Sequence, residues 1–275
     1  MSYLADQVRR DDHDRYLCVL FAPARLREDL FALYAFNAEV AKVRESVTEQ
    51  LIGRMKLQWW RDLIAAIYEG GNVPKGNPVV EALAVIVKRH GLAREDFDVL
   101  LETRERDVGD DDFADVADLE SYADGTSARL TSLALQILDV KDETSRAAGR
   151  HVGIAWALTG LMRAVLFHAR ANRVPLPQDL LAGAALTAHD VQERRNAARL
   201  AVVIEQVART ARAHLDKARS FRVDRGALAT LLPATLADSY LSGLERRKYD
   251  VYDPRHALQR PAVGRLIWNG LRGRF

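Results

Sequence analysis

The sequence predicts an all-α protein built as one helical domain. Apolar residues recur at the spacing of one face of an α-helix in nearly every segment. No segment shows sustained alternation of apolar and polar residues, so no β-sheet is expected. The connections between helical segments are short, and no change in composition marks a boundary. We therefore expect a single domain over residues 1–275, in which 1–14 is a candidate flexible segment.

Turn signals divide the chain into successive predicted helices. Pro23 suits the first turn of a helix that runs to residue 43, and a pair of glycines after residue 69 ends the next one. That second helix is expected to bury a stripe of apolar residues, namely Leu51, Met55, Trp59, Leu63 and Ile67. The predicted ranges are 23–43, 48–68, 78–89, 94–107, 116–138, 143–171, 193–220 and 226–248.

Composition excludes several classes of protein. The 275 residues are 48% hydrophobic, which is enough for one large core. Lysine and arginine total 40 against 38 acidic residues and are spread along the helices, so no nucleic-acid partner is expected. The single cysteine, Cys18, lies in an apolar stretch and is predicted to pack in the core. The charged N-terminus has no apolar secretory segment, which predicts a cytoplasmic protein.

Motifs of common nucleotide-binding and hydrolytic sites are absent from the sequence. It contains no GxGxxG, no GxxxxGK(S/T), no GxSxG and no HExxH. One acidic group follows the predicted helix 94–107, and we interpret it as a solvated loop rather than a metal site. Its members are Asp107, Asp110, Asp111 and Asp112.

Several motifs are similar to those of the squalene/phytoene synthase family. The run ALTGLMRAVLFHARANRVPLP (157–177) resembles the family signature QLTNxLRDxxEDxxxGRxYLP, and RYLCVLFAPARLREDLFALYAFNAEV (15–40) resembles the N-terminal helices. Tyr122 occupies the position of a central YCxxVA motif, and YDVY (249–252) resembles a late GYDVF segment. The resemblance implies a single isoprenoid-synthase-type helical bundle around a central apolar cavity.

Active members of that family carry two aspartate-rich motifs that hold magnesium ions against the substrate diphosphate. This chemistry needs carboxylates, because magnesium prefers oxygen ligands. Here the first motif falls on residues 41–45, where Ala41 replaces one acid and Glu45 keeps the other. In the second motif the metal-binding positions are Ala164 and His168. The resemblance therefore implies degenerate metal positions, with no bound metal, no cofactor and no catalytic residue.

A narrower resemblance accounts for this loss. The run AFNAEVAKVRESVTEQLIGRMKLQWW (35–60) is similar to a subgroup typified by the mitochondrial complex I assembly factor 6, which carries AFNxExAxxxxSVxExxIGxMxxQxW and also lacks the aspartate motifs. It implies a non-catalytic protein that acts in assembly of respiratory complex I. The partners would be complex I subunits or assembly intermediates, met at the inner face of the inner membrane.

The resemblance also yields candidate residues for lining the cavity or binding an anion. The basic members of this set can bind an anion directly, without a metal. The alternative, which we favour, is that they pair with Glu45, Glu39 or helix ends. Two adjacent tryptophans point about 100° apart on a helix, so one is expected in the core and the other at the cavity or a partner surface. The candidates are Phe36, Asn37, Lys42, Arg44, Glu45, Trp59, Tyr122, Arg163, His168 and Arg173.

Two further functions and one surface stay open. The chain is either non-catalytic or an active prenyl-diphosphate transferase with a non-standard site, and only the latter would need magnesium. A module that binds an isoprenoid or quinone-type lipid in its cavity is compatible with a role in complex I assembly. The C-terminal tail, 261–275, mixes apolar side chains with arginines and is a candidate for docking on an anionic membrane or a partner. A packed terminal helix is the alternative.

Overall fold

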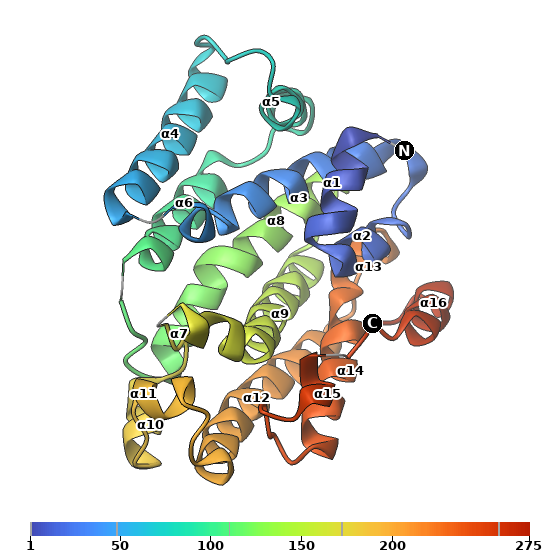
Figure 1. Ribbon diagram of the computed structural model, residues 1–275. Helices are drawn as coiled ribbons and strands as arrows, with labels where there is room; N and C mark the ends of the chain where they lie inside the picture. The colour runs from blue at the N-terminus through green and yellow to red at the C-terminus, as the bar shows by residue number, and fades with distance from the viewer. Residues whose placement is uncertain (1, 48, 110, 172, 258) are drawn as a thin grey trace.

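Helix α9 (Glu143–Arg170) runs through the middle of the bundle, with other helices packed along its length (Figure 1). Its start is capped by Asp142, whose side chain accepts a hydrogen bond from the backbone N–H of Ser145 at 2.7 Å. Its buried residues include Val152, Leu158 and Met162. By length and composition α9 would cross a membrane, but 50% of the relevant window is buried inside the bundle, as in the core helix of a globular protein.

Helices from both halves of the chain surround α9. The computed structural model describes residues 2–47, 49–109, 111–171, 173–257 and 259–275. The elements before α9 are α1 (Tyr3–Asp11), α2 (His13–Val19), η1 (Ala24–Leu26), α3 (Arg27–Ala41), η2 (Arg44–Ser46), α4 (Gln50–Glu69), α5 (Pro78–His90), α6 (Arg94–Val108), α7 (Val116–Ala123), the π-helical turn η3 (Asp124–Ala128) and α8 (Arg129–Ile137). Those after it are α10 (Gln178–Gly183), α11 (Ala188–Gln192), α12 (Ala197–Arg219), η4 (Arg225–Ala227), α13 (Leu228–Leu231), α14 (Pro233–Arg246), α15 (Pro254–Ala257) and α16 (Val263–Arg272).

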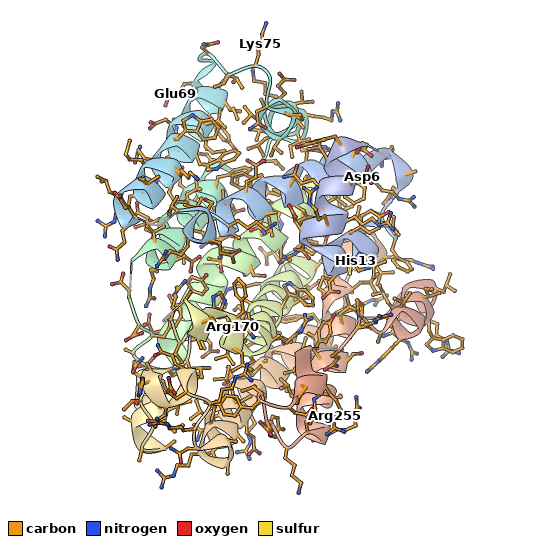
Figure 2. All side chains as sticks on the ribbon, viewed as in Figure 1. Asp6, His13, Glu69, Lys75, Arg170 and Arg255 are labelled. Carbon is orange, nitrogen blue, oxygen red and sulfur yellow. The ribbon has the colours of Figure 1, made fainter. Side chains whose placement is uncertain are left out.

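The all-α prediction is confirmed. Within the described ranges the structure has no strand, only an isolated bridge between Phe113 and Pro177. Side chains fill the space between the helices (Figure 2). Helix α3 is buried on nearly every side, and its Phe36 packs edge-on against Trp60 of α4 and Phe97 of α6, with ring centroids 5.0 and 5.5 Å away. One continuous hydrophobic core therefore joins the N-terminal helices to α9.

The structure corrects the predicted buried face of α4. Leu51, Met55 and Trp59, expected in the core, are 67%, 63% and 42% exposed. The helix carries two apolar stripes on different faces. Gly53 decides which is buried, because the absence of a side chain lets α4 approach Val108 of α6. The buried residues are Gly53, Leu57, Trp60, Leu63, Ile64 and Ile67. The predicted start of this helix, Thr48, lies outside the described residues.

Within the described residues, the N-terminal segment forms α1 and the start of α2. Ser2 caps α1 by accepting a hydrogen bond from the backbone N–H of Ala5 at 3.1 Å. Ala5 and Val8 are buried against α3. The amphipathic pattern in YLADQVRRD was overlooked because the segment is strongly charged. Helices α1 and α2 also bring the carboxylates of Asp11 and Asp14 to Lys42, at the end of α3, and to Arg163 of α9.

Helix α9 approaches η3 so closely that position 153 has no room for a side chain. A Cβ atom on Gly153 would lie 2.5 Å from the Cα atom and 2.8 Å from the backbone nitrogen of Ala128. Those atoms belong to the backbone of a buried turn, so they cannot move aside cheaply. By contrast, no atom lies within 4 Å of the Cβ position of Gly160, two turns along the same helix.

We expect Gly153→Ala to lower the free energy of unfolding by about 1–3 kcal/mol, because the methyl group forces α9 away from η3. Gly160→Ala is the matched control and should leave stability unchanged or raise it by up to about 1 kcal/mol, since alanine favours helix over glycine. Urea unfolding followed by circular dichroism measures both. Equal effects of the two substitutions would contradict this account of the packing.

Candidate functional site

A cavity of about 470 Å³ lies where the C-terminal end of α9 meets α6, α7 and the turn after α3. It brings together residues from four separate segments of the chain. The lining residues are Ala41, Arg44, Glu45, Val47, Arg104, Asp107, Tyr122, Leu161, Phe167, His168, Ala171, Arg173 and Pro175. The positions predicted from sequence that line it are Ala41, Arg44, Glu45, Tyr122, His168 and Arg173.

The first wall of the cavity is the turn that follows α3. Ala41 is the last residue of α3, and η2 places Arg44 and Glu45 beside the opening. Ser46 fixes this turn, because its hydroxyl accepts a hydrogen bond from the Nζ atom of Lys56 on α4 at 2.9 Å. Arg44 is half-buried and Glu45 is exposed. Neither has an ion-pair partner among the residues that the structure describes.

A buried carboxylate, Asp107, forms the polar floor of the cavity. Arg104 donates to its Oδ2 atom at 2.8 Å, the Tyr122 hydroxyl donates to Oδ1 at 2.8 Å, and Arg173 donates to Oδ1 at 3.0 Å. Burial alone raises the pKa of Asp107, but the two arginines outweigh it and hold that pKa below the ordinary 3.8. Burial likewise raises the pKa of Tyr122, so this phenol stays protonated and donates. The group ties α6, α7 and the segment after α9 together.

The third wall is the end of α9. The backbone N–H of Arg173 donates to the carbonyl oxygen of His168 at 3.0 Å and closes the helix. Burial lowers the pKa of His168, and the neighbouring Arg173 lowers it further, so the imidazole is neutral at pH 7. Phe167, which stands where the family has an acid, is 54% exposed at the rim.

Two of the predicted basic residues, Lys42 and Arg163, are not among the residues that line the cavity. The Nζ atom of Lys42 lies 2.8 Å from a carboxylate oxygen of Asp11, and the Nη1 atom of Arg163 lies 3.4 Å from Asp14. The guanidinium of Arg163 also lies 3.6 Å from the centroid of the Tyr240 ring. Both residues pair with acids, but neither partner is Glu39 or Glu45. The acids come from α1 and α2 rather than from α3 and η2. The sequence analysis did not predict these two helices, so it did not predict these pairs.

Four other candidates also fall outside the cavity lining. Phe36 and Asn37 are buried in α3, and Phe36 forms part of the aromatic core described above. Trp59 lies on the exposed face of α4, with only its edge against the buried Trp60. Ala164 is half-buried on α9. The reason is rotational, since these residues sit on helix faces turned toward the core or the solvent.

The residues that sequence reasoning missed are Arg104 and Asp107. Asp107 was assigned to a solvated loop, yet it lies in the last turn of α6 and is 8% exposed. Asp111 and Asp112 are exposed, as that interpretation required, and Asp110 lies outside the described residues. The available signal was the spacing of Arg104 and Asp107, which places an ion pair on one helix face.

These residues do not fit a magnesium site. No group of three or more His, Cys, Asp or Glu side chains within the described ranges is placed to hold a metal ion. Two carboxylates border the cavity, and Asp107 is already neutralised by arginines, which leaves Glu45. Ala41 and Ala164 offer no oxygen ligand, and a neutral imidazole such as His168 is not a preferred ligand of magnesium.

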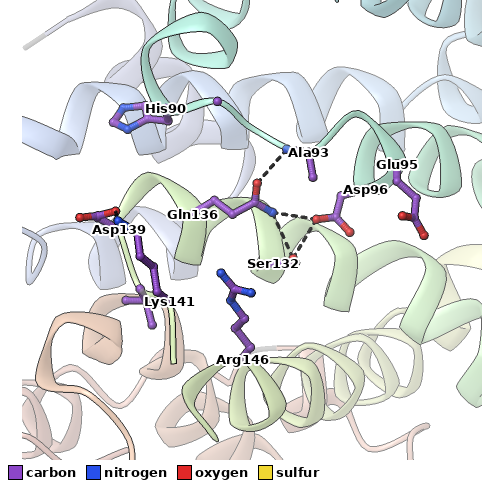
Figure 3. A pocket seen from close by; sticks show the side chains of 11 residues that line it. His90, Ala93, Glu95, Asp96, Ser132, Gln136, Asp139, Lys141 and Arg146 are labelled. Carbon is purple, nitrogen blue, oxygen red and sulfur yellow. Dashed lines mark hydrogen bonds and ion pairs between the residues drawn. The ribbon is translucent and has the colours of Figure 1, made fainter. Parts of the chain in front are cut away.

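A second cavity, of about 420 Å³, lies between the start of α6 and α8 (Figure 3). Its buried acid, Asp96, accepts hydrogen bonds from Ser132 and Gln136, both at 2.8 Å, and from Arg129 at 3.0 Å. The Gln136 amide oxygen in turn accepts from the backbone N–H of Ala93 at 2.8 Å. These polar groups satisfy one another, so we assign this cluster a structural role in joining α6 to α8.

Comparisons with known proteins agree with this geometry. A model of the squalene/phytoene synthase family matches residues 8–266. Human NADH dehydrogenase (ubiquinone) complex I, assembly factor 6 is 33% identical over 254 residues, which cover 92% of this chain and 76% of the human protein. Presqualene diphosphate synthase from Rhodopseudomonas palustris is 31% identical over 176 residues, which cover 64% of this chain and 62% of that enzyme.

Solved structures show the same fold. A crystal structure of a dehydrosqualene synthase superimposes with a TM-score of 0.82 at 17% identity, over 98% of this chain and 94% of that one. Squalene synthase from Alicyclobacillus acidocaldarius superimposes with a TM-score of 0.78 at 20% identity, over 90% and 93% of the two chains. The isoprenoid-synthase-type bundle predicted from sequence is confirmed.

We expect Asp107→Asn to lower the free energy of unfolding at pH 7 by about 3 kcal/mol or more, because it leaves Arg104 and Arg173 buried without their counter-charge. Asp112→Asn, on the exposed segment nearby, is the matched control and should stay within about 0.5 kcal/mol of the wild type. Chemical denaturation at a series of pH values measures both.

The pH series also tests the sign of the pKa shift. Since the pKa of Asp107 is lowered by folding, its stabilisation is present above the unfolded pKa and is lost as the pH falls through the folded one. The stability difference between wild type and Asp107→Asn should therefore shrink over the range below about pH 5, as the pH falls through the unfolded pKa of about 4 and then through the lower folded pKa. A difference that does not change over this range would mean that Asp107 is not charged in the native state.

Proposed function

This chain belongs to the squalene/phytoene synthase family, and we propose that it assists assembly of respiratory complex I without catalysing prenyl transfer. The observation that carries the proposal is the charge of the cavity. Diphosphate departure needs clustered cations held by carboxylates. Here the corresponding positions hold Ala41, Glu45, Ala164 and His168, and arginines neutralise Asp107, the buried acid of the cavity lining. Relatives named as complex I assembly factor 6 match almost the whole chain, which supports the assembly role.

The proposal includes a place and partners. The protein would act in the cytoplasm, at the inner face of the inner membrane, on complex I subunits or assembly intermediates. The exposed stripe on α4 supports a protein-binding role, since Leu51, Met55 and Trp59 are large apolar residues in contact with water.

We further propose that the cavity takes an isoprenoid or quinone-type lipid. Its volume is within the range of small-molecule sites, about 300–1,000 Å³. Leu161, Phe167 and Pro175 supply apolar surface, whereas Arg44 supplies hydrogen-bond donors without a paired acid. The buried Nε atom of Arg104 also has no acceptor among the described residues. An apolar cavity with free donors suits a neutral carbonyl head group on a prenyl chain better than a metal–diphosphate complex.

Deleting the gene should reduce the amount of assembled NADH:quinone oxidoreductase in host membranes. Native gel electrophoresis with in-gel activity measures it, and the wild-type gene supplied in trans should restore it. A normal level of assembled complex I in the deletion strain would contradict the assembly role.

Catalysis is tested separately on the purified protein. Incubation with farnesyl diphosphate or geranylgeranyl diphosphate and magnesium should release no more diphosphate than a heat-killed control. An active presqualene diphosphate synthase run in parallel shows that the assay works. Magnesium-dependent release above the control would establish the chain as a transferase with a non-standard site and end the non-catalytic proposal.

Leu161→Trp should reduce the lipid that stays bound, because the larger ring occupies the cavity. Native mass spectrometry of the protein after incubation with a short-chain ubiquinone measures the bound fraction, which we expect to fall at least about ten-fold. Val85→Trp on α5 is the matched control, since Val85 is 50% exposed and outside the cavity. Equal binding by both variants would place the lipid elsewhere.

A further inference from the structure

Helix α16 is held against the bundle by one face only. Leu266 is 1% exposed, and Gly270 meets the ring of Phe21 so closely that a side chain there would clash. Asn269 donates a hydrogen bond to the Thr235 hydroxyl of α14 at 3.0 Å. The helix lies at the edge of the molecule, away from α9 (Figure 1). Its orientation is therefore fixed, and so is the face that it presents to solvent.

The outward face of α16 is apolar. Val263, Ile267 and Leu271 follow one another at intervals of four residues and are 42%, 47% and 71% exposed. Trp268, beside this row, is 57% exposed. Four large apolar side chains on ten residues of helix form a ridge in contact with water. A ridge of this kind on a fixed helix marks a surface that binds something.

The charged side chains of α16 and of the residues after it are all positive. Residues 263–275 contain no acid, while Arg265, Arg272 and Arg274 are all exposed. The guanidinium of Arg272 lies 4.0 Å from the centroid of the Trp268 ring, so cation and indole are presented together. The carboxylate of Asp238 on α14 is shared between Arg219 at 2.7 Å and Arg265 at 3.4 Å.

We propose that α16 docks this protein on an anionic lipid bilayer. Aliphatic side chains and a tryptophan on one face, bordered by arginines, are the features of a helix that lies in the membrane interface. Leu271, Ile267 and Trp268 enter the boundary between headgroups and acyl chains, and the arginines contact lipid phosphates. This attachment is independent of what the cavity binds and of whether complex I is the client.

The exposed stripe on α4 provides an internal comparison. Leu51 and Met55 are as exposed as the ridge on α16, and Arg54 and Lys56 are nearby. However, Glu49 is the N-cap residue of α4, Asp62 lies on the helix, and Gln58 donates a hydrogen bond to Asp62 at 2.7 Å. Mixed charge suits a protein partner better than a negatively charged bilayer. The two surfaces are thus assigned to different partners.

Sedimentation of the full-length protein with vesicles tests the proposal. The vesicles are phosphatidylcholine alone or phosphatidylcholine mixed with phosphatidylglycerol, at low and high sodium chloride. The wild type should bind the mixed vesicles, bind phosphatidylcholine more weakly, and lose affinity for the mixed vesicles as salt rises. Ile267→Gln/Leu271→Gln should lower the partition constant at least about ten-fold, because two apolar side chains no longer leave water.

Two further variants separate the contributions. Arg272→Gln/Arg274→Gln should lower binding to the mixed vesicles about ten-fold and leave binding to phosphatidylcholine nearly unchanged. Leu51→Gln/Met55→Gln on α4 is the matched control and should bind like the wild type. All of these side chains are exposed, so circular dichroism and the unfolding midpoint should not change and loss of folding is excluded.

Three outcomes would overturn the proposal. They are no binding of the wild type to mixed vesicles, equal binding by the wild type and both α16 variants, and loss of binding only in the α4 variant. Light scattering tests the alternative that the ridge binds a second copy of this chain. If the Ile267→Gln/Leu271→Gln variant converts a dimer to a monomer while vesicle binding is unchanged, the ridge on α16 is an interface between two copies of this chain.

Discussion

The site depends on the pairing of the Asp107 carboxylate with two arginines. This carboxylate is buried, and a buried charge is tolerated only when donors surround it. Arg104, Tyr122 and Arg173 supply those donors from α6, α7 and the segment after α9. The carboxylate of Asp107 therefore holds the cavity walls together. Removing either the acid or its donors would leave the remaining buried groups without partners. The same arginines that stabilise this acid make it unavailable as a ligand for a cation.

The fold is that of the family, and the acid on the cavity floor is paired with arginines. The helical fold is shared with solved synthases at low sequence identity. In the cavity of this chain, Ala41 offers no carboxylate and the imidazole of His168 is neutral. A cavity that attracts magnesium needs excess negative charge. Among the described lining residues, three arginines instead face two carboxylates.

Much of the fold was accessible from sequence, because helical periodicity and turn residues are local signals. The long helices from α5 to α9 were placed to within a few residues by patterns such as Pro78 and Gly91 at the two ends of α5. The buried face of α4 was not, since two apolar stripes compete on that helix and the contact of Gly53 with Val108 decides between them. Likewise, α1 was missed because its apolar stripe is short.

The residues of the site could be predicted only where they belong to a recognisable sequence motif. Ala41, Glu45, His168 and Arg173 were located by resemblance, and the structure brings them to one cavity. Asp107 belongs to no motif that we recognised, and its importance follows from burial and from partners 15 and 66 residues away in the chain. Pairings over such distances depend on tertiary structure, which composition and periodicity do not encode.

The π-helical turn η3 sets the direction in which the side chains of α8 point relative to those of α7. One residue more than an α-helical turn needs shifts the later side chains by about 100° around the helix axis. With that shift, Tyr122 before the turn faces Asp107, while Thr131 and Leu135 after it meet α9 at Gly149. Deleting a single residue here would aim one of these two groups at the wrong neighbour. The π-helical turn thus sets the relative orientation of the residues that face the polar cavity and those that pack in the apolar core.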